Sequence, residues 1–177
     1  TTPWTLPSNT ALCVGDNIEY ALIETFNPYS LIHEYVVLAT ARIPAYFDAA
    51  NETTDMPETW QGETKQIPWK RIATIHGSDL AGLHYEQLIP WVKPMGEAFR
   101  VITGDYVTTE DGTGIVHIAP TSGQDDQRVA QKAGIGSLLL IDKEGNQRPM
   151  VDLRGRFFPL NELDAAFRSE YMDEPLY

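Results

Sequence analysis

The sequence predicts an α+β fold with a β-barrel-like core and short peripheral helices. Its 12 prolines and 13 glycines are spread along 177 residues, which leaves little room for long helices. Segments with strand-like patterns outnumber helical ones, and the two kinds do not alternate regularly as they would around a parallel sheet. A chain of this length can enclose one core of ordinary size, so we expect residues 1–177 to form a single domain.

Short apolar or alternating segments predict the strands. Residues 113–119, TGIVHIA, alternate most strongly and predict a central strand. Gly77 and Gly82 divide the stretch from 77 to 92 into strand-like pieces. The other predicted strands are residues 17–25, 35–39, 70–76, 97–107 and 138–141.

Helical patterns are fewer. Residues 123–133 have acids in the first turn and a lysine in the last, and they end at Gly134, as the helix dipole and a glycine C-cap favour. Residues 161–172 have apolar side chains at helical spacing, and residues 40–47 predict a short helix that a proline weakens. The polar residues 51–67 are expected to form an exposed excursion.

Composition excludes several classes of protein. The net charge of −12, from 25 acidic and 13 basic residues, argues against a protein that binds a long nucleic-acid duplex, but not against contact with one or two terminal nucleotides.

No apolar run approaches the roughly 18 residues that span a bilayer, so we expect no membrane partner. Cys13 is the only cysteine, which rules out an internal disulfide, suits a reducing compartment and leads us to expect a cytoplasmic protein.

The segment GTGIVHIAPTSGQDD, residues 112–126, carries the densest group of candidate site residues. His117 lies on the predicted strand, where a lone histidine is more often structural than catalytic. Asp125 and Asp126 fall in the first turn of the predicted helix, where acids commonly complement the helix dipole. Backbone amides of that turn also stabilise the ionised form of a carboxylate. Such a carboxylate is a poor general base, but it is well suited to bind an ammonium group.

Other kinds of catalytic site have no support in the sequence. The remaining histidines have no acidic partner at metal-ligand spacing and no HExxH motif is present, so we expect neither a metal nor another cofactor. Covalent catalysis lacks a nucleophile, because there is no GxSxG elbow and Cys13 lies in the apolar stretch ALCVG.

The opening segment TTPWTLPSN supplies hydroxyl and amide groups. Thr1, Thr2 and Thr5 can donate and accept hydrogen bonds, and Asn9 adds an amide. Two prolines restrict the backbone between them. A plainer interpretation is a strand-and-turn entry in which the threonines reflect β-propensity.

These segments together resemble a known family. TTPWTLPSN, VTTEDGTGIVHIAPTSGQDD and VAQKAGI closely resemble the editing domain inserted in class I aminoacyl-tRNA synthetases, and GSDLAGLHYEQLIP and VDLRGRFFP extend the resemblance over nearly the whole chain. His117 in GTGIVH favours the isoleucyl type over the valyl type, which usually has lysine there. The family motif usually has another threonine before Thr1, so we expect the chain to be an excised insertion that begins inside this motif.

The resemblance implies post-transfer editing, the metal-independent hydrolysis of the ester in mischarged valyl-tRNA(Ile). Asp126 would bind the α-ammonium of the misattached amino acid, while Thr2, Thr5, Trp4 and His117 would line the side-chain pocket, with His117 as a wall against isoleucine. Thr1, Thr2 and Asn9 would contact the terminal adenosine or position the attacking water. The implied partners are the 3′ end of the tRNA, the valine moiety and the rest of the parent synthetase.

Two alternatives remain open from the sequence. A valyl-type site would remove threonine from threonyl-tRNA(Val) instead. A non-catalytic barrel would only bind RNA ends or a protein partner, although no cluster of basic and aromatic residues indicates such a surface.

Overall fold

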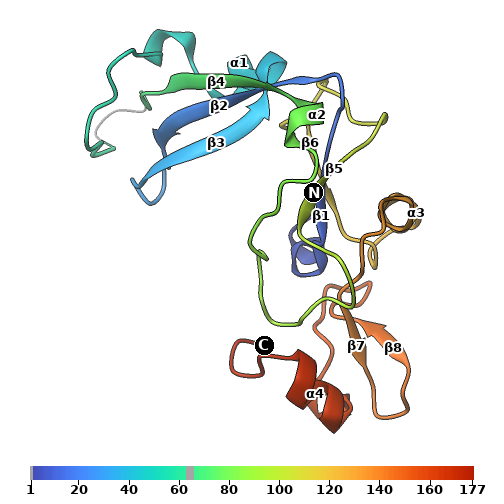
Figure 1. Cartoon of the computed structure of the whole chain (residues 1–177). Helices are drawn as coiled ribbons and strands as arrows, with labels where there is room; N and C mark the ends of the chain where they lie inside the picture. The colour runs from blue at the N-terminus through green and yellow to red at the C-terminus, as the bar shows by residue number, and fades with distance from the viewer. Residues whose placement is uncertain (1, 63–65) are drawn as a thin grey trace. The chain divides into compact units, whose positions relative to one another are not determined.

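The structure, a computed structural model, describes residues 2–62 and 66–177. Figure 1 shows short strands and short helices joined by long connections. The chain divides into two compact units, which are treated separately below. The first unit comprises Thr1–Cys13, Gly82–Ile102 and Val116–Tyr177, and the second comprises Val14–Ala81 and Thr103–Ile115.

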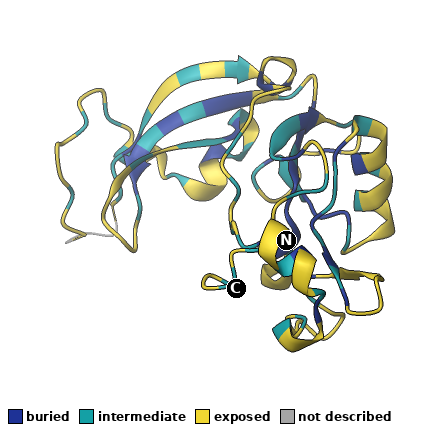
Figure 2. Cartoon of the chain, turned by 60° about the horizontal axis from the view of Figure 1, so that its bottom comes forward, coloured by how far each residue is buried: buried dark blue, intermediate teal, exposed yellow. Residues whose placement is uncertain are grey.

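The second unit is built on an antiparallel sheet with the order β3-β2-β4. The strands are β2 (Glu19–Phe26), β3 (His33–Ala39) and β4 (Lys70–His76), so the strands predicted at 17–25, 35–39 and 70–76 are confirmed. The central strand β2 is the most buried of the three, as Figure 2 shows. Its apolar residues pack with Trp69 and with Ile43 of the short helix α1 (Ile43–Tyr46), which follows the 3₁₀ turn η2 (Thr40–Arg42).

Close backbone packing ends this sheet at Gly77. A Cβ atom on Gly77 would lie 1.9 Å from the carbonyl oxygen of Gly15, so only glycine fits there. The chain then forms α2 (Gly77–Leu80) and continues without regular strands. It meets β5 (Arg100–Thr103) at an isolated bridge between His84 and Arg100, beside backbone hydrogen bonds that join Gly82 and Leu83 to Val101. The prediction of strand-like pieces from residue 77 to 92 is therefore wrong, because the pairing of this backbone with β5 does not extend beyond one isolated bridge.

Three strands form the sheet β5-β1-β6, most of which belongs to the first unit. They are β1 (Ala11–Val14), β5 (Arg100–Thr103) and β6 (Ile115–Ile118). The strand predicted at 113–119 is present as β6, but the prediction that it is central is wrong. The central place is taken by β1, three of whose four residues are fully buried, including Cys13.

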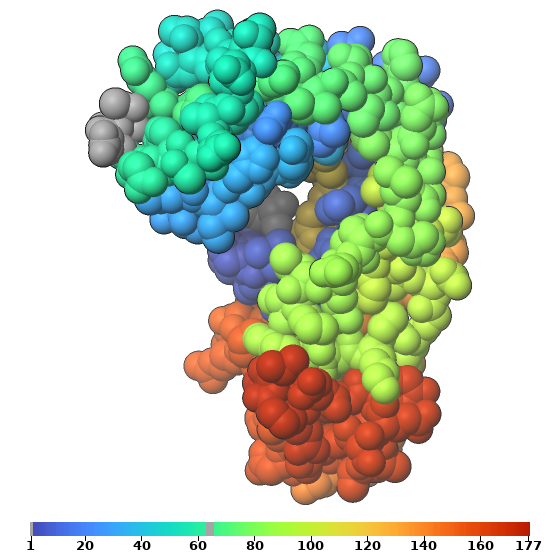
Figure 3. All heavy atoms as spheres, turned by 60° about the vertical axis from the view of Figure 1, so that its left-hand side comes forward, coloured from blue at the N-terminus to red at the C-terminus, as the bar shows by residue number. Residues whose placement is uncertain are grey.

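The C-terminal part of the first unit encloses its own apolar core. It contains α3 (Gln124–Ala133), the hairpin β7 (Leu139–Ile141) and β8 (Gln147–Pro149), and α4 (Ala165–Tyr171). The segment from the hairpin to the C-terminus is coloured orange to red in Figure 3. The buried residues of the core are Val92, which comes from the segment before β5, and Leu138, Leu140, Met150, Leu163 and Phe167.

Both helices of this part follow the predicted pattern with adjusted ends. α3 ends at Gly134, whose φ of 68° is the left-handed conformation expected of a glycine C-cap. α4 is shorter than the predicted 161–172, because Leu160–Glu162 forms a separate 3₁₀ turn and Asp164 caps the α-helix that follows.

The α+β class with short helices is confirmed, but the barrel is not. In the described part of the chain the strands form open sheets of three, three and two strands, with no closed barrel. The strands are three to eight residues long, and prolines or glycines stand at many of their ends. The expectation of a single domain stays a prediction. Within residues 2–62 and 66–177, no helix has the length and apolar character needed to cross a bilayer.

Candidate functional site

The opening segment folds as a 3₁₀ helix, η1 (Pro3–Ser8), and the expectation of a strand-and-turn entry is wrong. Pro3 stands at the start of the helix, where a missing N–H costs nothing. Thr5 donates to the carbonyl oxygen of Thr2 twice, from its amide at 3.1 Å and from its hydroxyl at 2.9 Å. The backbone N–H of Asn9 donates to the carbonyl oxygen of Leu6 at 3.1 Å and ends the helix. This turn holds Thr5 and Asn9 in fixed positions in the first unit.

His117 on β6 lies between these two side chains. Its Nε2 atom is 3.1 Å from the Thr5 hydroxyl oxygen, and its Nδ1 atom is 2.7 Å from the Asn9 amide nitrogen. Burial lowers the pKa of His117 below its ordinary value, although the nearby charge of Asp126 opposes this shift. The imidazole is therefore neutral at neutral pH, with both nitrogens in hydrogen bonds.

The two adjacent aspartates of α3 have different surroundings. Asp126 is half-buried, and its Oδ2 accepts a hydrogen bond from the backbone amide of Ala119 at 2.8 Å, which ties the first turn of α3 to the end of β6. Asp125 is exposed and pairs with Arg128 one turn further along the helix. Asp126, and not Asp125, thus carries its charge close to His117.

The predicted site residues are brought together only in part. Thr5, Asn9, His117 and Asp126 gather around one end of β6. Trp4 and Thr2 lie on the same 3₁₀ segment but are exposed, Trp4 at 55%. The predicted role of Thr1 falls outside the described residues.

Tyr85 belongs to this cluster and was not identified from the sequence. Its hydroxyl donates to Oδ1 of Asn9 at 2.7 Å, and its ring packs edge-on against Phe99 at 6.1 Å. Burial raises the pKa of Tyr85 well above its ordinary value, against the opposing effect of the Asn9 bond, so the phenol stays protonated. No sequence motif marks Tyr85, which is 76 positions from Asn9.

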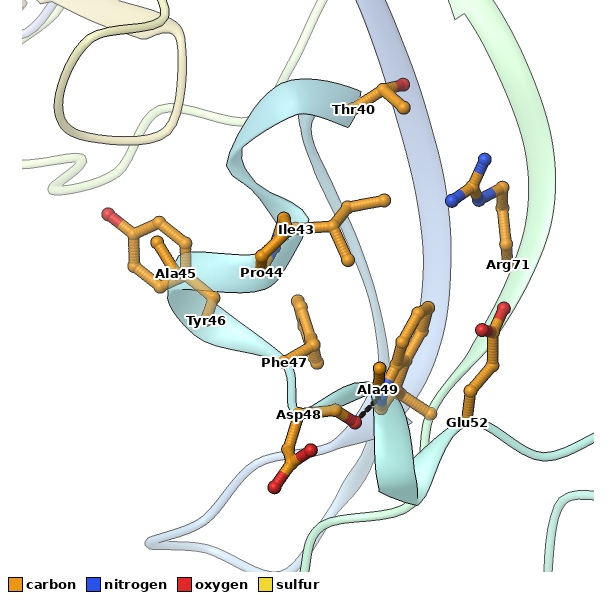
Figure 4. Close-up of a pocket in the computed structure, with 11 residues that line it drawn as sticks. Thr40, Ile43, Pro44, Ala45, Tyr46, Phe47, Asp48, Ala49, Glu52 and Arg71 are labelled. Carbon is orange, nitrogen blue, oxygen red and sulfur yellow. Dashed lines mark hydrogen bonds between the residues drawn. The ribbon is translucent and has the colours of Figure 1, made fainter.

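Two cavities lie outside this cluster, each within one unit. A cavity of about 510 Å³ borders the first turn of α3 and is lined by polar side chains including Thr121, Ser122, Gln124 and Gln127. Another, of about 590 Å³, lies in the second unit around α1, where Trp69 donates to the carbonyl oxygen of Asp48 at 2.8 Å (Figure 4). None of the predicted site residues lines either cavity. In the described ranges, no three His, Cys, Asp or Glu side chains gather as metal ligands would.

Comparison with known proteins shows which class of protein this chain resembles. No family model matches the chain. Curated proteins that match it along nearly its whole length are aminoacyl-tRNA ligases. The isoleucine–tRNA ligase of Porphyromonas gingivalis is 58% identical over 177 residues, covering 100% of this chain and 16% of that protein. The isoleucine–tRNA ligases of Cytophaga hutchinsonii and Clostridium tetani are 51% and 38% identical over 174 residues, covering 98% of this chain.

The chain is therefore a segment that matches isoleucine–tRNA ligases over its full length and spans about one sixth of their length. The solved structure of the P. knowlesi cytosolic leucyl-tRNA synthetase editing domain superposes with a TM-score of 0.48 at 13% identity, covering 74% of this chain and 49% of that one. A score below 0.5 does not establish a shared fold, and the assignment rests on the sequence matches.

Proposed function

We propose that this chain is the editing domain of an isoleucine–tRNA ligase and hydrolyses the ester bond of mischarged valyl-tRNA(Ile). Its partners would be the 3′ end of the tRNA, the valine moiety and the rest of the ligase, which would act in the cytoplasm. The observation that carries the proposal is the convergence of Thr5, Asn9, His117 and Asp126 at one end of β6, in a chain that matches such ligases over its full length.

The need for a second site follows from the limits of a binding pocket. An apolar pocket discriminates poorly against a side chain that is one methylene smaller, and the isoleucine–valine pair is the standard example. A site that accepts valine and excludes isoleucine removes the error afterwards. A rigid wall is required for that purpose, and the neutral His117 ring, held at both nitrogens, provides one.

The charged group of the substrate would be held by Asp126. Its carboxylate keeps one oxygen on the Ala119 amide, and the other can accept from an ammonium group. Hydrolysis would then depend on orienting water against the ester carbonyl and stabilising the developing oxyanion.

The test is single-turnover hydrolysis with the chain in excess over valyl-tRNA(Ile), comparing Asp126→Asn with the matched control Asp125→Asn. In Asp126→Asn the new amide side chain retains an acceptor for the Ala119 amide but loses the charge. We therefore expect the rate to fall roughly tenfold to a hundredfold, as for a lost charge-assisted hydrogen bond. The control should keep the wild-type rate, because Asp125 is exposed and paired with Arg128.

The same assay separates the alternatives. Cleavage of threonyl-tRNA(Val) but not of valyl-tRNA(Ile) would replace the isoleucyl assignment with the valyl type. Equal rates for wild type and Asp126→Asn, both above the uncatalysed rate, would refute the role of Asp126. Hydrolysis of neither ester would favour a non-catalytic domain that only binds RNA ends or a protein partner.

A further inference from the structure

We infer that Tyr85 is a positioning residue of the editing site, which acts through Asn9 to hold His117 as the neutral tautomer with hydrogen on Nε2. The inference concerns a side chain that the proposed function leaves without a role. It rests on the proposed function only for its catalytic consequence, since the tautomer can be observed without any substrate.

The hydrogen bonds of Asn9 determine whether Nδ1 of His117 carries a hydrogen. The Asn9 Nδ2 group lies 3.0 Å from the carbonyl oxygen of Ala11, which can only accept, so this atom is the amide nitrogen. The same nitrogen donates its second hydrogen to Nδ1 of His117 at 2.7 Å. Nδ1 must therefore be the unprotonated acceptor.

The hydrogen bonds of Thr5 determine independently whether Nε2 of His117 carries a hydrogen. The Thr5 hydroxyl has one hydrogen, which it donates to the carbonyl oxygen of Thr2 at 2.9 Å. Towards His117 the hydroxyl can then only accept, at 3.1 Å, so Nε2 must carry the hydrogen. Two separate arguments, one at each ring nitrogen, give the same tautomer.

Tyr85 completes the chain of donors. Its hydroxyl fills the remaining acceptor of Asn9, Oδ1, at 2.7 Å in a half-buried place where an unpaired carbonyl oxygen is costly. Its backbone is fixed by the bond from the Tyr85 amide to the carbonyl oxygen of Phe99 at 2.9 Å, and its ring by the contact with the Phe99 ring. The Asn9 amide is thus held at all three of its polar positions, which leaves it no freedom to turn.

This arrangement limits what His117 can do. A general base needs a free lone pair that faces the proton it removes, but the Nδ1 lone pair is occupied by Asn9 and Nε2 carries a hydrogen bonded to Thr5. His117 is therefore not a general base, which agrees with the role of a wall that the proposed function gives it. Loosening Asn9 would let the ring change tautomer and move, which would weaken the exclusion of isoleucine.

The experiment uses the whole chain with ¹⁵N-labelled histidine. Long-range proton–nitrogen correlation spectra show which ring nitrogen carries hydrogen, and His117→Gln assigns the signal among the four histidines. Tyr85→Phe is compared with Tyr177→Phe, a matched control that also removes a half-buried hydroxyl hydrogen bond in the first unit, from Tyr177 to the carbonyl oxygen of Phe158 at 2.8 Å.

We expect wild type and Tyr177→Phe to show hydrogen on Nε2 alone, and Tyr85→Phe to show a mixture of both neutral tautomers with an unchanged fold. Hydrogen on Nδ1 in the wild type would overturn the inference without any variant. An unaltered tautomer in folded Tyr85→Phe would also overturn it.

Hydrolysis supplies the second measurement. The ratio of rates on valyl-tRNA(Ile) and isoleucyl-tRNA(Ile) should fall roughly fivefold in Tyr85→Phe, on the scale of one neutral hydrogen bond, and stay constant in Tyr177→Phe. If the wild type does not hydrolyse valyl-tRNA(Ile), the proposed function fails, while the tautomer measurement still decides the role of Tyr85. If it does and the Tyr85→Phe ratio is unchanged, the positioning role fails alone.

Discussion

Asn9 presents a hydrogen to Nδ1 of His117 and so favours the neutral ring, which burial favours as well. In Asn9→Asp an acceptor replaces this donor, so Nδ1 gains a hydrogen and the imidazolium form gains a partner. We therefore expect the pKa of His117 to rise, with the charge of Asp126 acting in the same direction. An NMR titration of the His117 ring in wild type and in Asn9→Asp measures this. An unshifted His117 titration in Asn9→Asp would contradict the assigned hydrogen-bond direction.

The burial of neutral His117 also makes stability depend on pH. Because the folded-state pKa lies below that of the unfolded chain, acidification protonates the unfolded chain first. The contribution is thus fully present above an unfolded histidine pKa of about 6.5 and is lost as pH falls towards the folded value. Urea unfolding at about pH 7.5 and about pH 5.5 should show a larger loss for wild type than for His117→Gln. Equal losses would contradict this.

Individual residues differ in how far the sequence reveals them. His117 and Asp126 belong to a short segment in which a strand, a turn and a helix start follow one another, so their proximity is set locally. Tyr85 reaches Asn9 only through an irregular segment whose path depends on scattered backbone bonds, and no local pattern encodes such a path. Trp4 is exposed, and its predicted role in the pocket stays a prediction.

Among the elements, α4 depends on one capping residue. The Asp164 carboxylate accepts a hydrogen bond from the Phe167 amide at 2.8 Å, and Phe167 is a buried member of the C-terminal core. Asp164→Ala should lower the free energy of unfolding by about 1 kcal/mol. Chemical denaturation measures the loss, and Glu170→Ala, an exposed change on the same helix, should cost much less. Equal losses would show that the cap contributes nothing particular.

The elements themselves were the most predictable feature. Periodicity located β2, β3, β4 and α3, since each has a local pattern and turn or cap residues at its ends. The order of strands was not predictable, because β1 becomes central through pairing with segments about 90 and 100 residues further along the chain. A four-residue apolar strand such as β1 carries no signal of which neighbours it will have.

At the scale of the whole molecule, the predicted barrel shows the limit of local patterns. Closing a barrel requires every strand to pair on both sides, and that condition concerns all strands together. In the described residues β3 and β4 each pair with β2 only, so their sheet stays open. The strand content could be predicted from the sequence, while closure and the division into two compact units could not.

The net charge of −12 leads to a prediction about salt. A protein that binds RNA through many phosphate contacts loses roughly a thousandfold or more in affinity between about 50 and 200 mM salt, because bound counterions are released. This chain has only 13 basic residues and should contact only the 3′ end of the tRNA, so few counterions are involved. Salt instead screens the repulsion between two polyanions.

We therefore expect the second-order rate constant for hydrolysis of valyl-tRNA(Ile) by the chain to stay constant or rise over this range of salt. The valyl ester of adenosine is the control, because it has no phosphates and its rate should be nearly independent of salt. A steep fall for the tRNA alone would show that the chain carries an extended phosphate-binding surface, contrary to its charge. A fall for both substrates would indicate that the attraction between Asp126 and the ammonium group is screened, which would mean that this pair is exposed to solvent.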